Sequence, residues 1–445
     1  MKEKFNNQPL RGMVDRFPPD LREEYYIVNK IRELSKKYVY EEFEAPLLEP
    51  IEIYAAKSSE ELVNEQSFTF KSKGGGKLIL RPELTPSLAR MISRKSQEMK
   101  KPIRWFSVPT CYRYERPQRG RTREFKQINF DILGGIGLLE EVEIFNISVD
   151  IFTSFGATND QFQIYYNNRR LIDAIFKFIL KIPDNIYMKV YKALDKSDKM
   201  VEEEYQKYLM DTFNDDKLAK NIIQLNEIDN IEKIPYDNIP NEFYNSQGYQ
   251  EIKQLQILLK ETNLEEYCTF SAGIVRGLDY YTGTVFEVYD TEEKNRRSIF
   301  GGGRYDDLLN LFSNEQISGI GFGMGLLSLK LFLRTYNLIP ENIKELDYSD
   351  IIYVTTFSSE LAPLSIKLSQ KFRRMGFRCF IDYSCEKLGN QISKANELNC
   401  KAIAIIGPQE QEEKSVTIKN LLTNTQKTPK LKDLNVNVLE DILKK

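Results

Sequence analysis

The chain has 445 residues, of which 41% are hydrophobic and 29% charged, with a net charge of −2; this is ordinary for a soluble globular protein of about two or three domains. The near-zero net charge excludes a global basic field, so any nucleic acid must be bound by local patches. The chain contains no histidine, which excludes Ser-His-Asp and Cys-His catalysis and every metal site that needs imidazole.

The remaining chemistry must rely on Arg, Lys, carboxylates, Tyr, bound metal and the substrate itself, and nucleotidyl transfer is compatible with that set. The five cysteines are odd in number and include no CxxC pair. They indicate a reduced, cytoplasmic compartment and exclude a zinc cluster. No apolar run approaches ~20 residues and the N-terminus has no signal-peptide core, so no membrane association is expected.

The N-terminal part of the chain predicts short elements of both kinds. Apolar residues recur at helical spacing after Pro19, and prolines at 46 and 50 suit an edge or interface strand. The predicted elements are a helix following Pro19, an extended segment over 43–53, a strand over 77–80 and a helix over 87–93.

Residues 112–134 predict a β-hairpin with a strongly basic tip. Alternating segments flank a Pro-Gln-Arg-Gly turn. Planar guanidinium groups suit phosphate oxygens, so this density of charge favours a nucleotide or polyphosphate site over a solvated turn. Gln127, Asn129 and Asp131 alternate on one strand face, as expected for the lining of a polar pocket. The basic residues are Arg113, Arg116, Arg119, Arg121, Arg123 and Lys126.

From 171 to 264 the sequence is rich in Lys, Asn and Asp and has helical periodicity, which predicts a helical insertion within a β-rich domain. Residues 280–289 and 298–306 again have a strand-like pattern, and a segment with regularly spaced glycines follows over 319–325.

Two further clusters point to a ligand site, although each also has a structural interpretation. Residues 276–283, Arg-Gly-Leu-Asp-Tyr-Tyr-Thr-Gly, fit either a binding segment or a tyrosine-rich core strand with a surface arginine. Residues 301–306, Gly-Gly-Gly-Arg-Tyr-Asp, let backbone approach a ligand closely, but consecutive glycines also make ordinary turns.

After Pro340 the sequence predicts an independent unit with alternating strands and helices, which is typical of a small doubly wound sheet. The predicted strands are 351–356, 377–381, 402–406 and 416–419, and the predicted helices are 361–375, 387–398 and 438–443.

Together these clusters resemble histidyl-tRNA synthetases, which are class II aminoacyl-tRNA synthetases, over nearly the whole chain. Segments 276–281 and 302–306 resemble the two that are specific to the histidine enzyme. The other resembling segments are 11–15 (an N-terminal signature), 43–53 (motif 1, a dimer-interface element), 81–85 (an amino-acid-binding turn), 112–134 (motif 2) and the anticodon-binding C-terminus.

The resemblance implies an α+β fold, in which an antiparallel-sheet catalytic domain carries a helical insertion and is followed by a C-terminal α/β anticodon-binding domain. The implied domains are a first catalytic part at 1–170, a helical insertion at 171–264, a second catalytic part at 265–340 and an anticodon-binding domain at 345–445.

The resemblance also implies the site residues, with Arg113 and Arg276 as the catalytic pair. Arg116 and Gln118 are expected to contact the tRNA acceptor end. ATP is expected to contact Arg113, Glu115, Arg121, Phe125 and Arg276. Histidine is expected to contact Glu83, Thr85, Arg113, Gln127, Asp131, Arg276, Tyr280, Tyr281 and Tyr305.

These roles make chemical sense, because an imidazole ring needs an acceptor for one nitrogen and a donor for the other. Asp131 and Tyr281 fit these needs, although the family more often has Glu at the first position. The implied reaction is histidine–tRNA ligation, with ATP, L-histidine and histidine tRNA as substrates and a homodimer as the assembly. Mg²⁺ is expected with ATP, no zinc or haem is expected, and the metal-binding residues are unknown.

One departure concerns ATP binding. The family's motif 3 usually ends with a Glu-Arg pair where this chain has Leu327 and Ser328. Lys330 is no simple substitute, since two residues along a helix rotate the side chain by about 200°. Two alternatives remain: a regulatory paralogue of the synthetase that acts with ATP phosphoribosyltransferase, and another class II synthetase, such as the prolyl or threonyl type.

Overall fold

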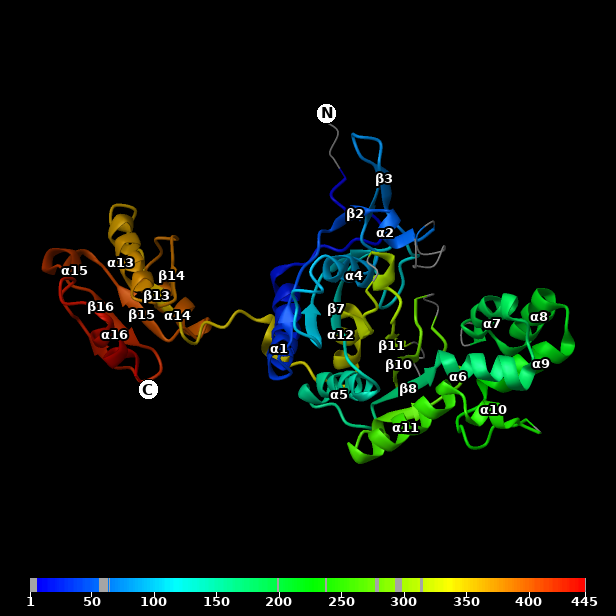
Figure 1. The fold of residues 1–445 in the computed structure, drawn as a ribbon. Coiled ribbons are helices and arrows are strands. Elements are labelled where there is room, and N and C mark those ends of the chain that lie inside the picture. The colour runs from blue at the N-terminus through cyan, green and yellow to red at the C-terminus, as the bar shows by residue number, and fades with distance from the viewer. Residues whose placement is uncertain are drawn as a thin grey trace. The chain divides into compact units, whose positions relative to one another are not determined.

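The structure is a computed structural model that describes residues 6–55, 63, 65–197, 200–236, 238–276, 280–292, 298–312 and 315–444. The chain forms two compact units, Met1–Lys344 and Glu345–Lys445. Figure 1 labels many of the elements of both units. Within the described residues, no helix is both long and apolar enough to cross a membrane.

A nine-stranded, mainly antiparallel sheet forms the centre of the larger unit. Its order is β1-β5-β7-β12-β11-β10-β8-β9, with β6 paired to one end of β7. Only the outermost pairs, β1 with β5 and β8 with β9, are parallel in the described residues. The strands are β1 (Glu41–Glu42), β5 (Ile103–Ser107), β6 (Thr110–Tyr112), β7 (Glu124–Leu133), β8 (Phe162–Asn168), β9 (Cys268–Phe270), β10 (Thr284–Asp290), β11 (Ser298–Arg304) and β12 (Gly319–Gly325).

The period-two alternation of β7 sorts its side chains onto two faces. Ile128, Phe130 and Ile132 lie in the main hydrophobic core, while Gln127 and Asp131 point to the opposite face with their neighbour Asn129. Helices pack over the core face, where apolar burial stabilises the sheet by about 1.5–3 kcal/mol per large side chain. These helices are α1 (Pro18–Lys37), α5 (Leu139–Ser154) and α12 (Leu326–Thr335).

Within the described part of residues 48–93, the chain forms a small three-stranded sheet and two short helices. The sheet order is β2-β4-β3. One helix begins at residue 85, earlier than the predicted residue 87. The prediction of an extended segment is wrong at residues 52 and 53, which begin a short helix. The elements are β2 (Leu48–Pro50), α2 (Glu52–Ala55), β3 (Thr69–Lys71), β4 (Lys77–Leu80) and α4 (Thr85–Ser93).

A helical region follows β8, and in Figure 1 its helices α7, α8 and α9 stand to one side of the sheet. Helix α11 returns the chain to the sheet by packing on α6 and β8. The elements are α6 (Arg169–Ala174), a π-helix (Ile175–Leu180), a 3₁₀ turn (Asp184–Ile186), α7 (Tyr187–Leu194), α8 (Glu202–Phe213), α9 (Asp216–Asn226), α10 (Asn241–Tyr244), α11 (Gln247–Glu261) and a 3₁₀ turn (Glu265–Tyr267). Two further 3₁₀ turns, Leu309–Leu311 and Glu341–Lys344, come later in this unit.

The smaller unit is a five-stranded sheet with helices, in the order β14-β13-β15-β16-β17. The first three strands are parallel, whereas β16 and β17 are antiparallel, so the sheet is mixed. The sequence predicts no helix between its third and fourth strands, but α15 lies there. The elements are β13 (Ile352–Val354), α13 (Ala362–Arg374), β14 (Cys379–Ile381), α14 (Leu388–Glu397), β15 (Ala402–Ile405), α15 (Pro408–Glu413), β16 (Thr417–Asn420), β17 (Gln426–Lys427) and α16 (Val436–Leu443).

Candidate active site

A pocket on the polar face of the large sheet brings together segments that are far apart in the sequence. Its cavity volume is about 210 Å³ and its lining combines charged groups with aromatic rings, which suits an organic ligand with polar groups better than a single small ion. The predicted residues that line it are Glu83, Thr85, Arg113, Glu115, Arg121, Phe125, Gln127, Arg276, Tyr280, Tyr281 and Tyr305.

Glycines of β12 form part of the pocket floor. Gly323 lies opposite Asn129 in the strand register, and Gln127 donates from Nε2 to Asn129 Oδ1 at 2.8 Å. A Cβ atom added to Gly323 would lie 2.0 Å from Gln127 Nε2. At Gly321, an added Cβ would lie 2.2 Å from an Asp131 oxygen. The polar side chains of β7 therefore lean over β12 because β12 has no side chains there.

Glu83 is buried at the bottom of the pocket and is held from two sides. Tyr280 donates its hydroxyl to Glu83 Oε2 at 3.0 Å, and Tyr54 donates to the Glu83 carbonyl at 3.0 Å. Burial raises the pKa of Tyr281, and the neighbouring Arg276 opposes this rise. Tyr281 therefore presents a neutral hydroxyl, which both donates and accepts hydrogen bonds.

Asp131 does not itself line the pocket. It is 3% exposed and accepts a hydrogen bond from Tyr305, whose hydroxyl lies 2.6 Å from Oδ1. Burial raises the pKa of Asp131 to about 7, with Tyr305 opposing the rise and Glu83 adding to it. Asp131 is therefore not among the residues that line the pocket, whereas its hydrogen-bond partner Tyr305, which is also buried, is one of them.

Arg276 is anchored by a carboxylate that the sequence interpretation did not include. Its Nη1 lies 2.5 Å from Glu287 Oε1, and Glu287 also accepts from Tyr289 at 2.6 Å. Burial alone would lower the pKa of Arg276, but the Glu287 carboxylate raises it, so the guanidinium stays charged. An added Cβ on Gly301 would lie 2.5 Å from Arg276 Nη1, so the glycine of β11 makes room for this arginine.

The β6–β7 hairpin supplies a second group of charged residues that line the pocket, far from Arg276 in the sequence. Arg113 donates from Nε to the Pro82 carbonyl at 2.9 Å, and its guanidinium carbon lies 5.4 Å from the centre of the Phe125 ring. Arg121 pairs with Glu115 at 3.0 Å. A flat aromatic face beside two cations suits a purine with its phosphates.

The two residues predicted to meet tRNA, Arg116 and Gln118, are exposed on the hairpin tip and do not line the pocket. The tip is closed by paired hydrogen bonds between the backbones of Gln118 and Arg121. The N-terminal segment supports it, since the Gly12 carbonyl accepts from the Arg123 amide at 2.8 Å.

Leu327 and Ser328, which replace the usual motif 3 pair, line the pocket at the start of α12. Lys330 points away, as its helical position predicts. It is buried against α1, where its Nζ lies 3.2 Å from Glu23 Oε2. Lys330 therefore does not substitute for the missing arginine.

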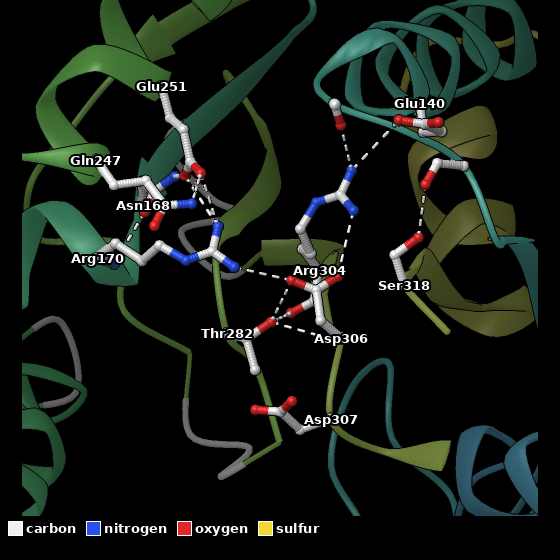
Figure 2. A network of polar contacts seen from close by, with 12 residues as sticks. Glu140, Asn168, Arg170, Gln247, Glu251, Thr282, Arg304, Asp306, Asp307 and Ser318 are labelled. Carbon is white, nitrogen blue, oxygen red and sulfur yellow. Dashed lines mark hydrogen bonds and ion pairs between the residues drawn. The ribbon is translucent and has the colours of Figure 1, made fainter. Parts of the chain in front are cut away.

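A polar network joins the residues that follow the two pocket tyrosines (Figure 2). Thr282 and Asp306, which immediately follow Tyr281 and Tyr305, bind each other through Oγ1 and Oδ2 at 3.1 Å. Arg170 of α6 donates to the same Asp306 oxygen at 2.8 Å. The start of the helical region is therefore tied to the segments that carry the pocket tyrosines.

Three residues of the Arg-Gly-Leu-Asp-Tyr-Tyr motif, Gly277, Leu278 and Asp279, lie outside the described residues. Across the described part of the chain, no three His, Cys, Asp or Glu side chains gather as a group that could hold a metal ion.

Sequence reasoning missed residues whose roles depend on tertiary contacts. Glu287 and Arg170 carry no motif signal, because each matters only through a partner brought close by the fold. The one available signal for Glu287 is its place in β10, where a charged residue interrupts a Val-rich and aromatic strand.

The mainly antiparallel sheet, the arginine-bearing hairpin and the glycine-floored pocket define a class II aminoacyl-tRNA synthetase catalytic domain. The family model described as histidyl-tRNA synthetase matches residues 12–329, and the model described as anticodon binding domain matches residues 351–442. The chain belongs to the histidyl-tRNA synthetase family.

Curated relatives agree with this assignment, and solved structures agree with the fold. The chain is 33% identical to a histidine–tRNA ligase of Leptospira biflexa, with both chains covered over 100%. It is 32% identical to that of Haloarcula marismortui, over 93% of each chain. The fold matches a histidyl-tRNA synthetase of Nostoc with a TM-score of 0.71 at 22% identity, covering 99% of both chains. A Bacillus halodurans structure titled as an ATP phosphoribosyltransferase regulatory subunit/histidyl-tRNA synthetase has a TM-score of 0.67, covers 88% of this chain and 97% of that one, and at 20% identity supports the fold alone.

Proposed function

We infer that this chain is a histidine–tRNA ligase, which activates L-histidine with ATP to histidyl-adenylate and transfers it to the 3′ end of histidine tRNA. The observation that carries the inference is the single pocket lined jointly by residues of 83–85, 113–127, 276–281 and 305.

The inner part of the pocket is proposed to bind histidine. Glu83 and Gln127 would bind the ammonium, and Thr85 would line its site. Tyr281 would bind one imidazole nitrogen. Asp131 would recognise the other imidazole nitrogen, either by direct contact or through Tyr305, from which it accepts a hydrogen bond. The remaining predicted contact, Tyr280, is proposed to orient Glu83, because its hydroxyl donates to that carboxylate.

The hairpin side of the pocket is proposed to bind ATP, with Phe125 against the adenine and Arg121 near the β- or γ-phosphate. Arg113 would bridge the histidine carboxylate and the α-phosphate. The carboxylate would attack the α-phosphorus and pyrophosphate would leave, while Arg276 neutralises charge on the α-phosphate in the transition state. Positioning and charge neutralisation suffice for this step, which fits a chain without histidine.

Mg²⁺ is proposed to enter with ATP, because this ion is usually held by substrate phosphates together with one or two carboxylates. Glu115 fits such a role, since its carboxylate lines the pocket beside Arg113 and Arg121. When bound, Mg²⁺ would neutralise phosphate charge. No zinc or haem is proposed.

Recognition of tRNA is proposed to use both units. The exposed tip residues Arg116 and Gln118 would meet the acceptor end, and the domain at 345–445 would bind the anticodon. In this partition the catalytic domain spans 1–170 and 265–340, and the helical insertion spans 171–264. A homodimer and a cytoplasmic location are part of the proposal, the latter because all five cysteines are free.

The test is ATP–pyrophosphate exchange with each standard amino acid in turn. Histidine alone should drive exchange, and only when Mg²⁺ is present. Exchange with proline or threonine would identify a different class II specificity. Absence of exchange with every amino acid would favour the regulatory paralogue. The observation that motivates this alternative is that Leu327 and Ser328 line the pocket where the family usually has a Glu-Arg pair.

A further inference from the structure

Arg276 adopts a backbone conformation that an arginine rarely takes. Its φ is +54°, in the left-handed region that non-glycine residues avoid. Such a conformation persists only when surrounding contacts impose it, and it is most often found at functional sites. The contacts that impose it here therefore identify residues on which the orientation of Arg276 depends.

Arg169, the first residue of α6, provides the main contact. Its side chain is 7% exposed, and Nη2 donates to the Arg276 carbonyl at 2.9 Å and to the Val275 carbonyl at 3.3 Å. Its backbone amide donates to the Gly283 carbonyl at 2.9 Å. Arg169 thus holds the chain on both sides of the segment 276–283.

The guanidinium of Arg169 is itself held in place. It lies over the Tyr191 ring of α7, at 4.7 Å from the ring centre, and the Tyr191 hydroxyl donates to the Arg169 carbonyl at 3.1 Å. The preceding Asn167 assists by donating to the Ala272 and Ile274 carbonyls at 2.9 and 3.0 Å. The end of β8 and the start of α6 therefore hold the backbone of the segment 272–276, which leads up to the Arg276 side chain.

Local helix energetics do not explain this arginine. The first turn of α6 contains no acidic residue and begins with Arg169 and Arg170, whereas the positive end of the helix dipole favours acidic side chains. A buried cation at this position is unfavourable for the helix alone. Its tertiary contacts to the 275–276 carbonyls give it a role that local structure does not.

We propose that Arg169 is a positioning residue for histidine activation, which fixes the backbone of Arg276 so that its guanidinium meets the α-phosphate. The inference rests on the proposed function, in which Arg276 neutralises the transition state. Arg169 touches no substrate and acts only through Arg276. Because it also stacks on Tyr191, it joins the helical region to the reacting end of the pocket.

The test is a double-mutant cycle on the full chain, measured as the single-turnover rate of histidyl-adenylate formation. Arg169→Met should lower the rate by about ten- to a hundredfold, the scale expected for a small misplacement of a catalytic group. Histidine and ATP affinities should change by less than about threefold. In an Arg276→Ala background, Arg169→Met should lower the rate by less than about twofold, because the group it positions is gone.

The adjacent Arg170 is the matched control, since it also lies in the first turn of α6 but pairs with Glu251 and Asp306 and not with the 275–276 carbonyls. The effects of Arg170→Met and Arg276→Ala should add. Arg169→Lys, which keeps one donor, should recover part of the rate and remains testable if the methionine variant fails to fold.

The outcomes separate the two claims. An unchanged rate in Arg276→Ala would overturn the proposed role of Arg276 itself. A large effect of Arg276→Ala together with an unchanged rate in Arg169→Met would overturn only the positioning role. A full loss from Arg169→Met in the Arg276→Ala background would show that Arg169 acts elsewhere, which also overturns it.

Discussion

Arg276 bonds to Glu287 through Nη1, so the phosphate oxygens of ATP would share this guanidinium with a carboxylate. The pair lies at 2.5 Å with both side chains 19% exposed. A hydrogen bond to a charged partner contributes about 1 kcal/mol more than one to a neutral partner. The Glu287 charge is therefore expected to oppose phosphate binding while it holds the arginine in the pocket.

Glu287→Gln should consequently tighten the binding of a non-hydrolysable ATP analogue by about fivefold, the equivalent of that difference. Calorimetric titration measures it. Glu251→Gln is the control, since Glu251 pairs with Arg170 outside the pocket and should leave the affinity unchanged. A weaker affinity in Glu287→Gln would mean that the carboxylate helps to present Arg276 to the triphosphate.

Burial raises the pKa of Asp131 to about 7. Because this pKa is higher folded than unfolded, the folded chain keeps the proton longer as pH rises. The Asp131 contribution to the free energy of unfolding therefore falls between about pH 4 and pH 7 and is constant above.

Asp131→Asn should remove that dependence. Between pH 5 and pH 8 the free energy of unfolding of the wild type should fall by about 3 kcal/mol relative to that of the variant, measured by denaturant unfolding of the larger unit.

Histidine binding should weaken by roughly tenfold or more in Asp131→Asn, because an acceptor-only group becomes one that also presents donors. Tyr305→Phe distinguishes the route: if Asp131 acts through Tyr305, this variant should reproduce the loss. Equal histidine affinity in wild type and Asp131→Asn would place Asp131 outside recognition.

At the scale of elements, the site depends on the pairing of a polar strand face with a strand of glycines. Gly323→Ala would place a methyl group 2.0 Å from Gln127 Nε2, so Gln127 would have to leave its position. Histidine binding should fall by about tenfold or more, the equivalent of losing one charge-assisted hydrogen bond to the ammonium.

Gly389→Ala is the control for Gly323→Ala. A Cβ added to Gly389 meets nothing within 4 Å, so both histidine activation and binding should be unchanged. An unchanged histidine affinity in Gly323→Ala would show that Gln127 does not bind the ammonium.

The elements that build the site were predictable where the pattern has a simple period. The alternation of Gln127 and Ile128 along β7 separates the pocket face from the core face without any structure. By contrast, α15 has the sequence Pro-Gln-Glu-Gln-Glu-Glu, with no apolar stripe. It is fixed by the Gly407 amide, which donates to Glu410 Oε2 at 2.9 Å, and periodicity carries no such information.

The sequence also did not predict which side chains of a polar strand face line the pocket. Asp131 and Gln127 share one face of β7, yet only Gln127 lines the pocket, while Asp131 accepts a hydrogen bond from Tyr305. The fold class is confirmed, as are the antiparallel partners of the hairpin. The dependence of Arg276 on Glu287 and Arg169 comes from contacts across strands and helices, for which a single sequence has no signal.

At the scale of the whole molecule, the two compact units allow the chemistry to be separated from tRNA selection. A chain ending at Lys344 contains the entire pocket. It should retain histidine-dependent pyrophosphate exchange within about threefold, because no pocket residue is lost, but aminoacylation of tRNA should fall by about tenfold or more. Comparison of both assays on the same preparation provides the control. Full aminoacylation by the shortened chain would remove the proposed role of residues 345–445.

The glycine floor also affects how the free protein moves. Strands β11 and β12 sit in the middle of the sheet, yet at Gly301, Gly321 and Gly323 their pocket side is covered by the polar side chains of Arg276, Asp131 and Gln127 and not by side chains of their own. A bound amino acid and nucleotide would hold these covering side chains in place. The amide hydrogens of these strands should therefore exchange with solvent faster than those of other central strands in the free chain, and they should slow most when substrates bind.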